Sequence, residues 1–224
     1  MDKVRYFGAG CAIVAEMFGA AYLIDSIVVS NVTGATASLV ASTLIQVALV
    51  IAMLMGFFSE RKQLLFGALL ISMAYNGIAY FLNDIEVCFP IDRILVDHSW
   101  AEATDMLIYF AVDFLWAISV IFVFFATFAK AKRLGFIPSI VLFFILGGVL
   151  LVNSIFGFIA SAQSTTADPT VGIGCLGDGF TLFEYALGLM YCFNKTGAVE
   201  DVGFVPEIKN GEPEDGEKDQ NRLD

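Results

Sequence analysis

Long, uninterrupted apolar blocks are the feature of this sequence that most constrains its fold. Five of them are as long as a membrane-spanning helix: residues 7–30, 37–58, 64–82, 106–128 and 137–160. Crossing about 30 Å of hydrocarbon takes about 20 helical residues, because each residue advances a helix by about 1.5 Å. Membrane β-strands alternate apolar and polar residues, which these blocks do not. We therefore predict an all-α protein, a polytopic transmembrane helical bundle.

A sixth apolar block, residues 179–193, is short for a span. It reaches full length only if its helix begins near Val171, and that start would place Cys175 and Asp178 inside the helix. The preceding segment, residues 161–178, is rich in Ser, Thr, Gly and Pro, so we expect it to be irregular. With this block included, we predict about six spans within a bundle of residues 1–197.

The basic residues predict the orientation of these spans. Of the 12 Lys and Arg residues, only Arg93 falls on one side of a six-span bundle. The short basic segments all fall on the other side, at residues 3–5, 61–62 and 130–133. Short loops rich in Lys and Arg face the cytoplasm. We therefore expect both termini to be cytoplasmic, in the plasma membrane or a membrane of the secretory pathway.

The C-terminal segment, residues 198–224, is acidic and poor in apolar residues beyond Val205. Such a segment cannot bury enough surface to offset its ordering entropy, so we predict a disordered cytoplasmic tail. One interpretation makes it a docking site for a cytoplasmic protein, and the simpler one is a solvated terminus. The formal net charge of -11 argues against nucleic acid as a partner.

Two cysteines fall in the predicted outer segments. Cys88 and Cys175 would meet an oxidising compartment there, which permits a disulfide between them. Such a bond would tie the two outer connections together, and the alternative is two free thiols. Cys11 and Cys192 fall near the inner ends of their helices, where a disulfide is not expected.

Ionisable groups inside the spans are the candidate functional residues, because they are costly in hydrocarbon and usually face the bundle interior or water. Four acids qualify, and no Lys, Arg or His accompanies them inside a span. Together with two amides they suggest a polar vestibule open to the outside, lined by Asp25, Asn76, Asp113, Asn153 and Glu184. The other interpretation is that these groups form hydrogen bonds between packed helices.

Glu16 is the fourth of these acids and is separate from the vestibule. It lies near mid-depth, nine residues before Asp25 on the same helix. Nine residues turn a helix by about 900°, so the two acids project from opposite sides. We therefore expect Glu16 to be a gate or a second site.

The sequence lacks the residues that haem and zinc sites inside the helices would need. The only histidine is His98 in the outer loop, so paired haem ligands and a histidine zinc site inside the helices are not expected. We predict no metal and no cofactor.

The leading functional prediction is a channel- or transporter-like protein that passes a cation, a proton or a small polar solute. A pore of six spans would suit sharing between subunits, so we expect a homo-oligomer. The second hypothesis is a non-transporting membrane organiser or adaptor that binds other proteins through its outer loops and acidic tail. A lipid-modifying enzyme that uses two carboxyls as acid and base ranks third.

Overall fold

The computed structural model of the chain describes residues 2–30, 36–88, 100–128, 132–163 and 170–193. These ranges hold six α-helices and no strand: α1 (Asp2–Ser30), α2 (Thr36–Phe58), α3 (Lys62–Cys88), α5 (Trp100–Phe128), α6 (Lys132–Gln163) and α7 (Thr170–Cys192). The predicted all-α class is confirmed for this part of the chain. The acidic tail and most of the outer loop at residues 83–105 lie outside it.

Every described helix is long enough to cross a bilayer. The shortest have 23 residues and the longest has 32, which correspond to about 35 Å and about 48 Å of helix. Two stretches are also apolar enough for this by composition, Met106–Phe128 and Phe136–Ile159, and they suggest that the protein associates with a membrane.

Helix α7 differs from its predicted form. It begins at Thr170, so the glycine-rich segment that we expected to be irregular is largely helical. Glycine weakens an isolated helix but lets helices pack closely in a bundle. A side chain added at Gly179 would place its first carbon 3.2 Å from the backbone oxygen of Gly147 on α6. Packing against α6 therefore explains why α7 begins as early as Thr170, and local composition does not reveal such packing.

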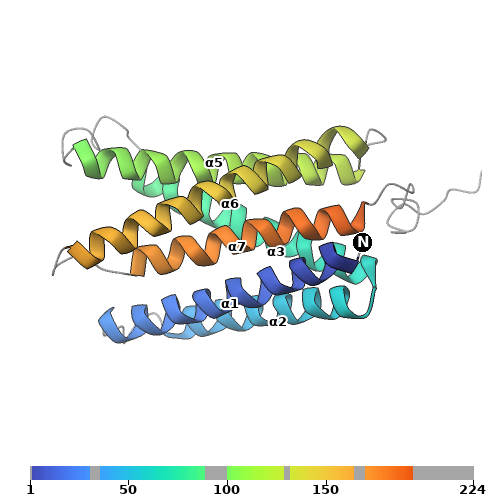
Figure 1. Cartoon of the computed structure of the whole chain (residues 1–224), viewed down its shortest axis with the longest axis horizontal. Helices are drawn as coiled ribbons and strands as arrows, with labels where there is room; N and C mark the ends of the chain where they lie inside the picture. Colours follow the sequence, from blue (N-terminus) through green and yellow to red (C-terminus); the bar gives the residue numbers. More distant parts are fainter. Residues whose placement is uncertain (1, 31–35, 89–99, 129–131, 164–169, 194–224) are drawn as a thin grey trace, which may run out of the picture.

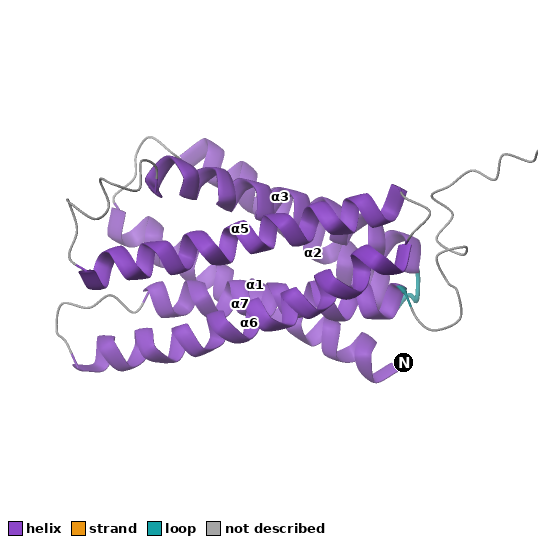
Figure 2. Cartoon of the chain, turned by 90° about the horizontal axis from the view of Figure 1, so that it is seen from above, coloured by secondary structure: helices purple, strands orange, loops and turns teal. Residues whose placement is uncertain are grey.

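The helices lie side by side along the long axis of the molecule (Figure 1). Their contacts form a closed ring in chain order. Each packs against its neighbours in the chain, and α7 closes the ring against α1. Helix α7, which lies between α1 and α6 (Figure 2), also contacts α3 across the ring. The turn from α2 to α3 lies at the same end of the bundle as the N-terminus (Figure 1).

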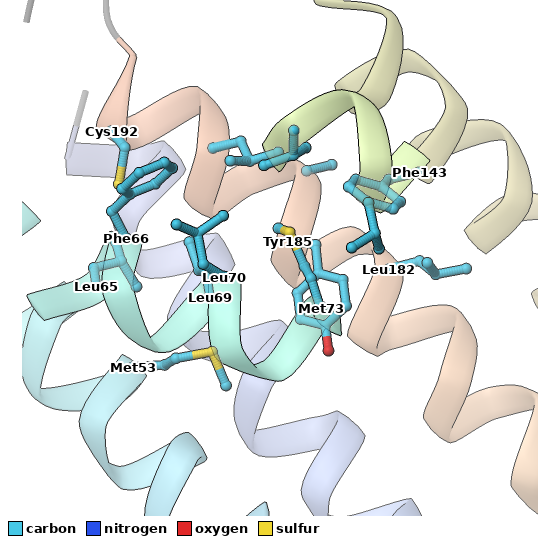
Figure 3. Packing of buried hydrophobic residues seen from close by; sticks show 14 of the residues in the cluster. Met53, Leu65, Phe66, Leu69, Leu70, Met73, Phe143, Leu182, Tyr185 and Cys192 are labelled. Carbon is cyan, nitrogen blue, oxygen red and sulfur yellow. The ribbon is translucent and has the colours of Figure 1, made fainter. Parts of the chain in front are cut away.

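The core is apolar and is concentrated around α7. Figure 3 shows side chains from four helices meeting there, among them Met53, Leu65, Leu69, Met73, Phe143, Leu182 and Tyr185. The outward faces of the other helices are apolar as well. Phe128 is 79% exposed and Met17 is 68% exposed, whereas the only large hydrophobic side chain found exposed on α7 in the described part is Met190.

Candidate functional site

Glu184 is the most deeply buried acid that the structure describes. Only 2% of its surface is exposed. It lies eight residues before the end of α7, about 12 Å from that end along the helix. Its Oε1 atom is fully buried and has no hydrogen-bond partner among the described residues. Burying a polar group without a hydrogen bond costs about 1–3 kcal/mol in protein mutational data, so the protein retains this side chain at a price in stability.

The α1–α7 interface places Glu16 near this carboxyl. Glu16 is half-buried on α1, and Glu184 interacts electrostatically with it and with Cys11. Alanines make the contact between the helices tight, since Ala12 is fully buried and Ala15 nearly so. Two acids that the sequence analysis assigned to separate places therefore belong to one interface.

The contacts between α1 and α7 fix the vertical offset of the two acids. The helices run antiparallel: Phe18 stacks on Phe180, and a side chain added at Gly174 would touch the ring of Tyr22. In this register Glu184 is level with about residue 12 of α1. Glu16 lies four residues further from the end of the bundle that holds the N-terminus, which is about 6 Å, or roughly one helical turn.

Asn76 belongs to a different polar cluster, which joins α2, α3 and α7. Its side-chain nitrogen donates to the hydroxyl of Tyr185 at 2.9 Å, and its side-chain oxygen accepts from Gln46 at 3.0 Å. Ser72 and Tyr185 share a hydrogen bond of 2.7 Å. These hydrogen bonds give Asn76 the partners that an interhelical packing role requires.

Asn153 belongs to a third cluster, which joins α5, α6 and α7. It donates to the hydroxyl of Tyr109 at 2.7 Å, and this hydroxyl lies 3.1 Å from the sulfur of Cys175. Cys175 is buried and is a free thiol. The structure therefore gives no support to the predicted disulfide with Cys88, because the Cys175 sulfur faces Tyr109 and Asn153 inside the bundle. The side chain of Cys88 lies outside the described part.

Asp113 and Asp25 are the two remaining residues of the predicted vestibule. Asp113 is half-buried on α5, between Tyr109 and Trp116, which contact α7 through Cys175 and Tyr185. Asp25 lies on α1, and its side chain is outside the described part. The structure thus places Glu16 and Glu184 on two packed helices, α1 and α7, and places Asn76 and Asn153 in two separate hydrogen-bonded clusters.

Sequence reasoning did not single out the tyrosines that organise these clusters. Tyr109 and Tyr185 lie in strongly apolar helices, and their hydroxyls are hydrogen-bonded inside the bundle. A tyrosine hydroxyl usually finds a partner when it is buried. A tyrosine at mid-helix in an apolar block was therefore the signal that could have identified them.

An ion pair lies at the end of the bundle that holds the N-terminus. Arg5 on α1 is bonded to Glu60, which lies in the turn between α2 and α3. The hydrogen bond with Glu60 raises the pKa of the Arg5 guanidinium above its ordinary value. The backbone of Glu60 has a φ of 60°, the left-handed region that usually favours glycine. The pair ties α1 to the α2–α3 turn.

The chemistry of the site must be judged from these residues. Within the described residues, no group of three or more His, Cys, Asp and Glu side chains is placed to hold a metal ion. Two carboxyls in an apolar interface can bind and release protons or attract a cation. Compared with known proteins, the chain matches no family model, no curated protein and no solved structure.

Proposed function

We propose that this chain is a multi-pass membrane protein of the transporter or channel type, whose carboxyls Glu16 and Glu184 bind and release a proton or a cation on its way across the bilayer. The single observation that carries the proposal is the buried Oε1 of Glu184, which has no hydrogen-bond partner within the described residues. An ionisable side chain that is retained inside a membrane protein at a cost in stability is a candidate functional residue, unless a bonding partner accounts for its burial.

The apolar outer surface of the bundle is evidence that lipid, and not water, surrounds it. In the two described stretches that are apolar enough to span, only 33% and 28% of the window is buried, whereas the core helix of a soluble protein would be mostly covered. Large apolar side chains such as Phe125 and Phe156 are more than half exposed. Lipid tails are the surroundings in which such a surface is stable. We therefore propose that all six helices span, as their lengths permit.

The charges support a cytoplasmic location for the end that holds the N-terminus. Arg5, Arg61 and Lys62 lie there on α1 and around the α2–α3 turn. The positive-inside rule assigns this end to the cytoplasm. Asp25, Asp113 and Asn153 lie nearer the opposite ends of their helices, so we propose that they line the approach from outside. A homo-oligomer remains part of the proposal.

Reconstitution in lipid vesicles tests the proposal. We expect flux of protons or of an alkali cation through the wild-type protein, and a loss of about 100-fold in Glu184→Gln, comparable to removing a positioned proton-transfer group. Thr181→Val is the matched control on the same helix, since the Thr181 hydroxyl bonds only to the backbone of its own helix, at Gly177, 3.0 Å away. This control should keep the wild-type flux.

The absence of any flux above that of empty vesicles would overturn transport and favour the adaptor hypothesis. Equal flux in the wild type and in Glu184→Gln would overturn the assignment of the site. Monodisperse elution of each variant in detergent establishes that it is folded before flux is compared.

A further inference from the structure

We infer that the end of the bundle that holds the N-terminus binds an acidic phospholipid. Its phosphate lies against Lys3, Tyr6 and Arg61, which we call the headgroup patch, and its acyl chains lie along α1. The inference goes beyond ion transport, and it shares with the proposed function only the placement of the bundle in a membrane. It is carried by a surplus of basic groups, a tyrosine hydroxyl that can donate, and an adjoining apolar stripe.

The headgroup patch joins the start of α1 to the turn between α2 and α3, which lie at the same end of the bundle (Figure 1). Arg5 connects the two segments, because one of its guanidinium nitrogens is bonded to Glu60 and the other donates to the hydroxyl of Tyr6 at 3.1 Å. Arg61 directly follows Glu60 in the turn. The hydroxyl of Tyr6 and the base of the Arg61 side chain therefore belong to one surface.

Basic groups outnumber acidic ones on this surface. Among the side chains that the structure describes here, four are basic and one is acidic: Lys3, Arg5, Arg61, Lys62 and Glu60. Glu60 is bonded to Arg5, and the nitrogen of Lys62 lies 5.8 Å from the centre of the Tyr191 ring. Lys3 and Arg61 are exposed. The charges left for a ligand are therefore positive, as an anionic headgroup requires.

Tyr6 adds a hydrogen-bond donor to the headgroup patch. Its side chain is 55% exposed, and the Arg5 guanidinium lies 4.9 Å from the centre of its ring. Since the hydroxyl oxygen accepts from Arg5, the hydroxyl hydrogen is left to donate, and it meets no acceptor among the described residues. Phosphate oxygens accept such hydrogen bonds, and tyrosines are common where a membrane meets water.

An apolar stripe on α1 continues from the headgroup patch toward the hydrocarbon. Phe7 and Met17 are each 68% exposed, and Gly10 lies between them. A side chain added at Gly10 would meet no other part of the protein within 4 Å. Residues three, four and seven positions apart share one face of a helix, so this stripe begins beside Lys3 and Tyr6. Gly10 leaves open space in the stripe, which an acyl chain can fill.

An acidic phospholipid fits both parts of this surface. Its phosphate can accept from Arg61 and Tyr6, and its chains match the apolar stripe. Acidic lipids are found in the cytoplasmic leaflet, and the positive-inside rule assigns this end of the bundle to the same side. The acidic segment at residues 198–224 has charges of the same sign, but it is poor in apolar residues that could cover the stripe.

Lipid binding by the full-length protein in an uncharged detergent tests the inference. Native mass spectrometry counts the lipids that stay bound, and thermal unfolding reports how far they stabilise the protein. We expect phosphatidylglycerol to bind and to raise the unfolding temperature. Phosphatidylcholine with the same acyl chains should do neither at that concentration, because its headgroup carries its own cation.

Variants of the headgroup patch locate the site. Loss of one positive charge near a membrane surface should weaken binding about fivefold, so we expect this in Lys3→Ala and in Arg61→Ala, and about 25-fold in the double variant. Tyr6→Phe keeps the ring and should lose about two- to tenfold. Arg93→Ala is the matched control, since it removes one positive charge from the predicted outer loop and should bind as the wild type does. Equal unfolding temperatures without lipid establish that the variants are folded.

Three outcomes would overturn the inference. The first is equal binding of the two lipids, or wild-type affinity in the double variant. The second is equal stabilisation by glycerol 3-phosphate, which would show that a free phosphate suffices. The third is a carbodiimide cross-link between Lys3 and an acid of residues 198–224 in protein that binds no phosphatidylglycerol, which would assign the headgroup patch to the acidic segment.

Failure of this inference can be told apart from failure of the proposed function, because lipid binding is measured without flux. Selective binding of phosphatidylglycerol by a protein that passes no ion would overturn transport and support the lipid site. Ion flux through a protein without selective lipid binding would overturn the lipid site and support transport.

Discussion

Two adjacent residues on α7, Glu184 and Tyr185, are both buried but differ in their hydrogen bonding. Tyr185 is fully buried, and its hydroxyl is bonded to Ser72 at 2.7 Å and to Asn76 at 2.9 Å. Glu184 is 2% exposed, and its Oε1 has no hydrogen bond within the described residues. Successive residues on a helix differ by about 100°, so one side chain faces the polar groups of α3 and the other faces α1. A buried polar group with partners is explained by packing, and one without them calls for a function.

The sharpest test of this comparison replaces Glu184 by an apolar side chain of similar length. We expect Glu184→Met to stabilise the protein by about 1–3 kcal/mol, because the unpaired polar atom is removed, while ion flux is lost. Thermal unfolding in detergent measures the change. A lower unfolding temperature would show that Glu184 has a stabilising partner after all.

The opposite sign is expected for its neighbour. Tyr185→Phe removes the hydroxyl that Ser72 and Asn76 use, so it should destabilise the protein by about 1 kcal/mol, as interhelical hydrogen bonds in membranes do. Ion flux should change little, since Tyr185 is not one of the two carboxyls of the proposed site. The same unfolding measurement applies, and an unchanged midpoint would mean that the hydrogen-bond cluster contributes nothing to stability.

The smallest effect is expected at the ion pair between Arg5 and Glu60. The Glu60 side chain is two-thirds exposed, whereas the Arg5 side chain is only 9% exposed. Solvent screens the Glu60 end of the pair, and ion pairs in contact with solvent contribute about 0–1 kcal/mol. Glu60→Gln keeps the turn and removes the charge, so the loss of stability should be at most about 1 kcal/mol. Unfolding at low and at high salt checks this, because added salt should reduce the difference between wild type and variant. A loss several times larger would show that the pair controls the packing of α1.

The all-helical class could be predicted because hydropathy and length are local properties. Residues 106–128 are apolar at almost every position, and no neighbour is needed to make them a long helix. The start of α7 was predicted only conditionally: a full-length sixth helix had to begin near Val171, and the helix begins at Thr170. The glycines between Gly172 and Gly179 resemble a loop by composition, yet α1 and α6 pack against them at van der Waals distance.

For the candidate site too, the sequence identified the residues but not their positions relative to one another. The acids of the apolar helices were identified from the sequence, which also predicts that Glu16 and Asp25 project from opposite sides of their helix. The proximity of Glu16 and Glu184 was not identified, because it depends on the antiparallel register of two helices that are more than 100 residues apart in the chain.

Apart from the start of α7, the sequence alone therefore determined the helical segments that the structure describes and the polar groups within them, since both follow from the chemistry of each residue and its near neighbours. The tertiary structure decided which of these groups find partners. Hydrogen bonding between helices depends on rotation and register, and these are set by the packing of glycine and alanine faces across the whole bundle.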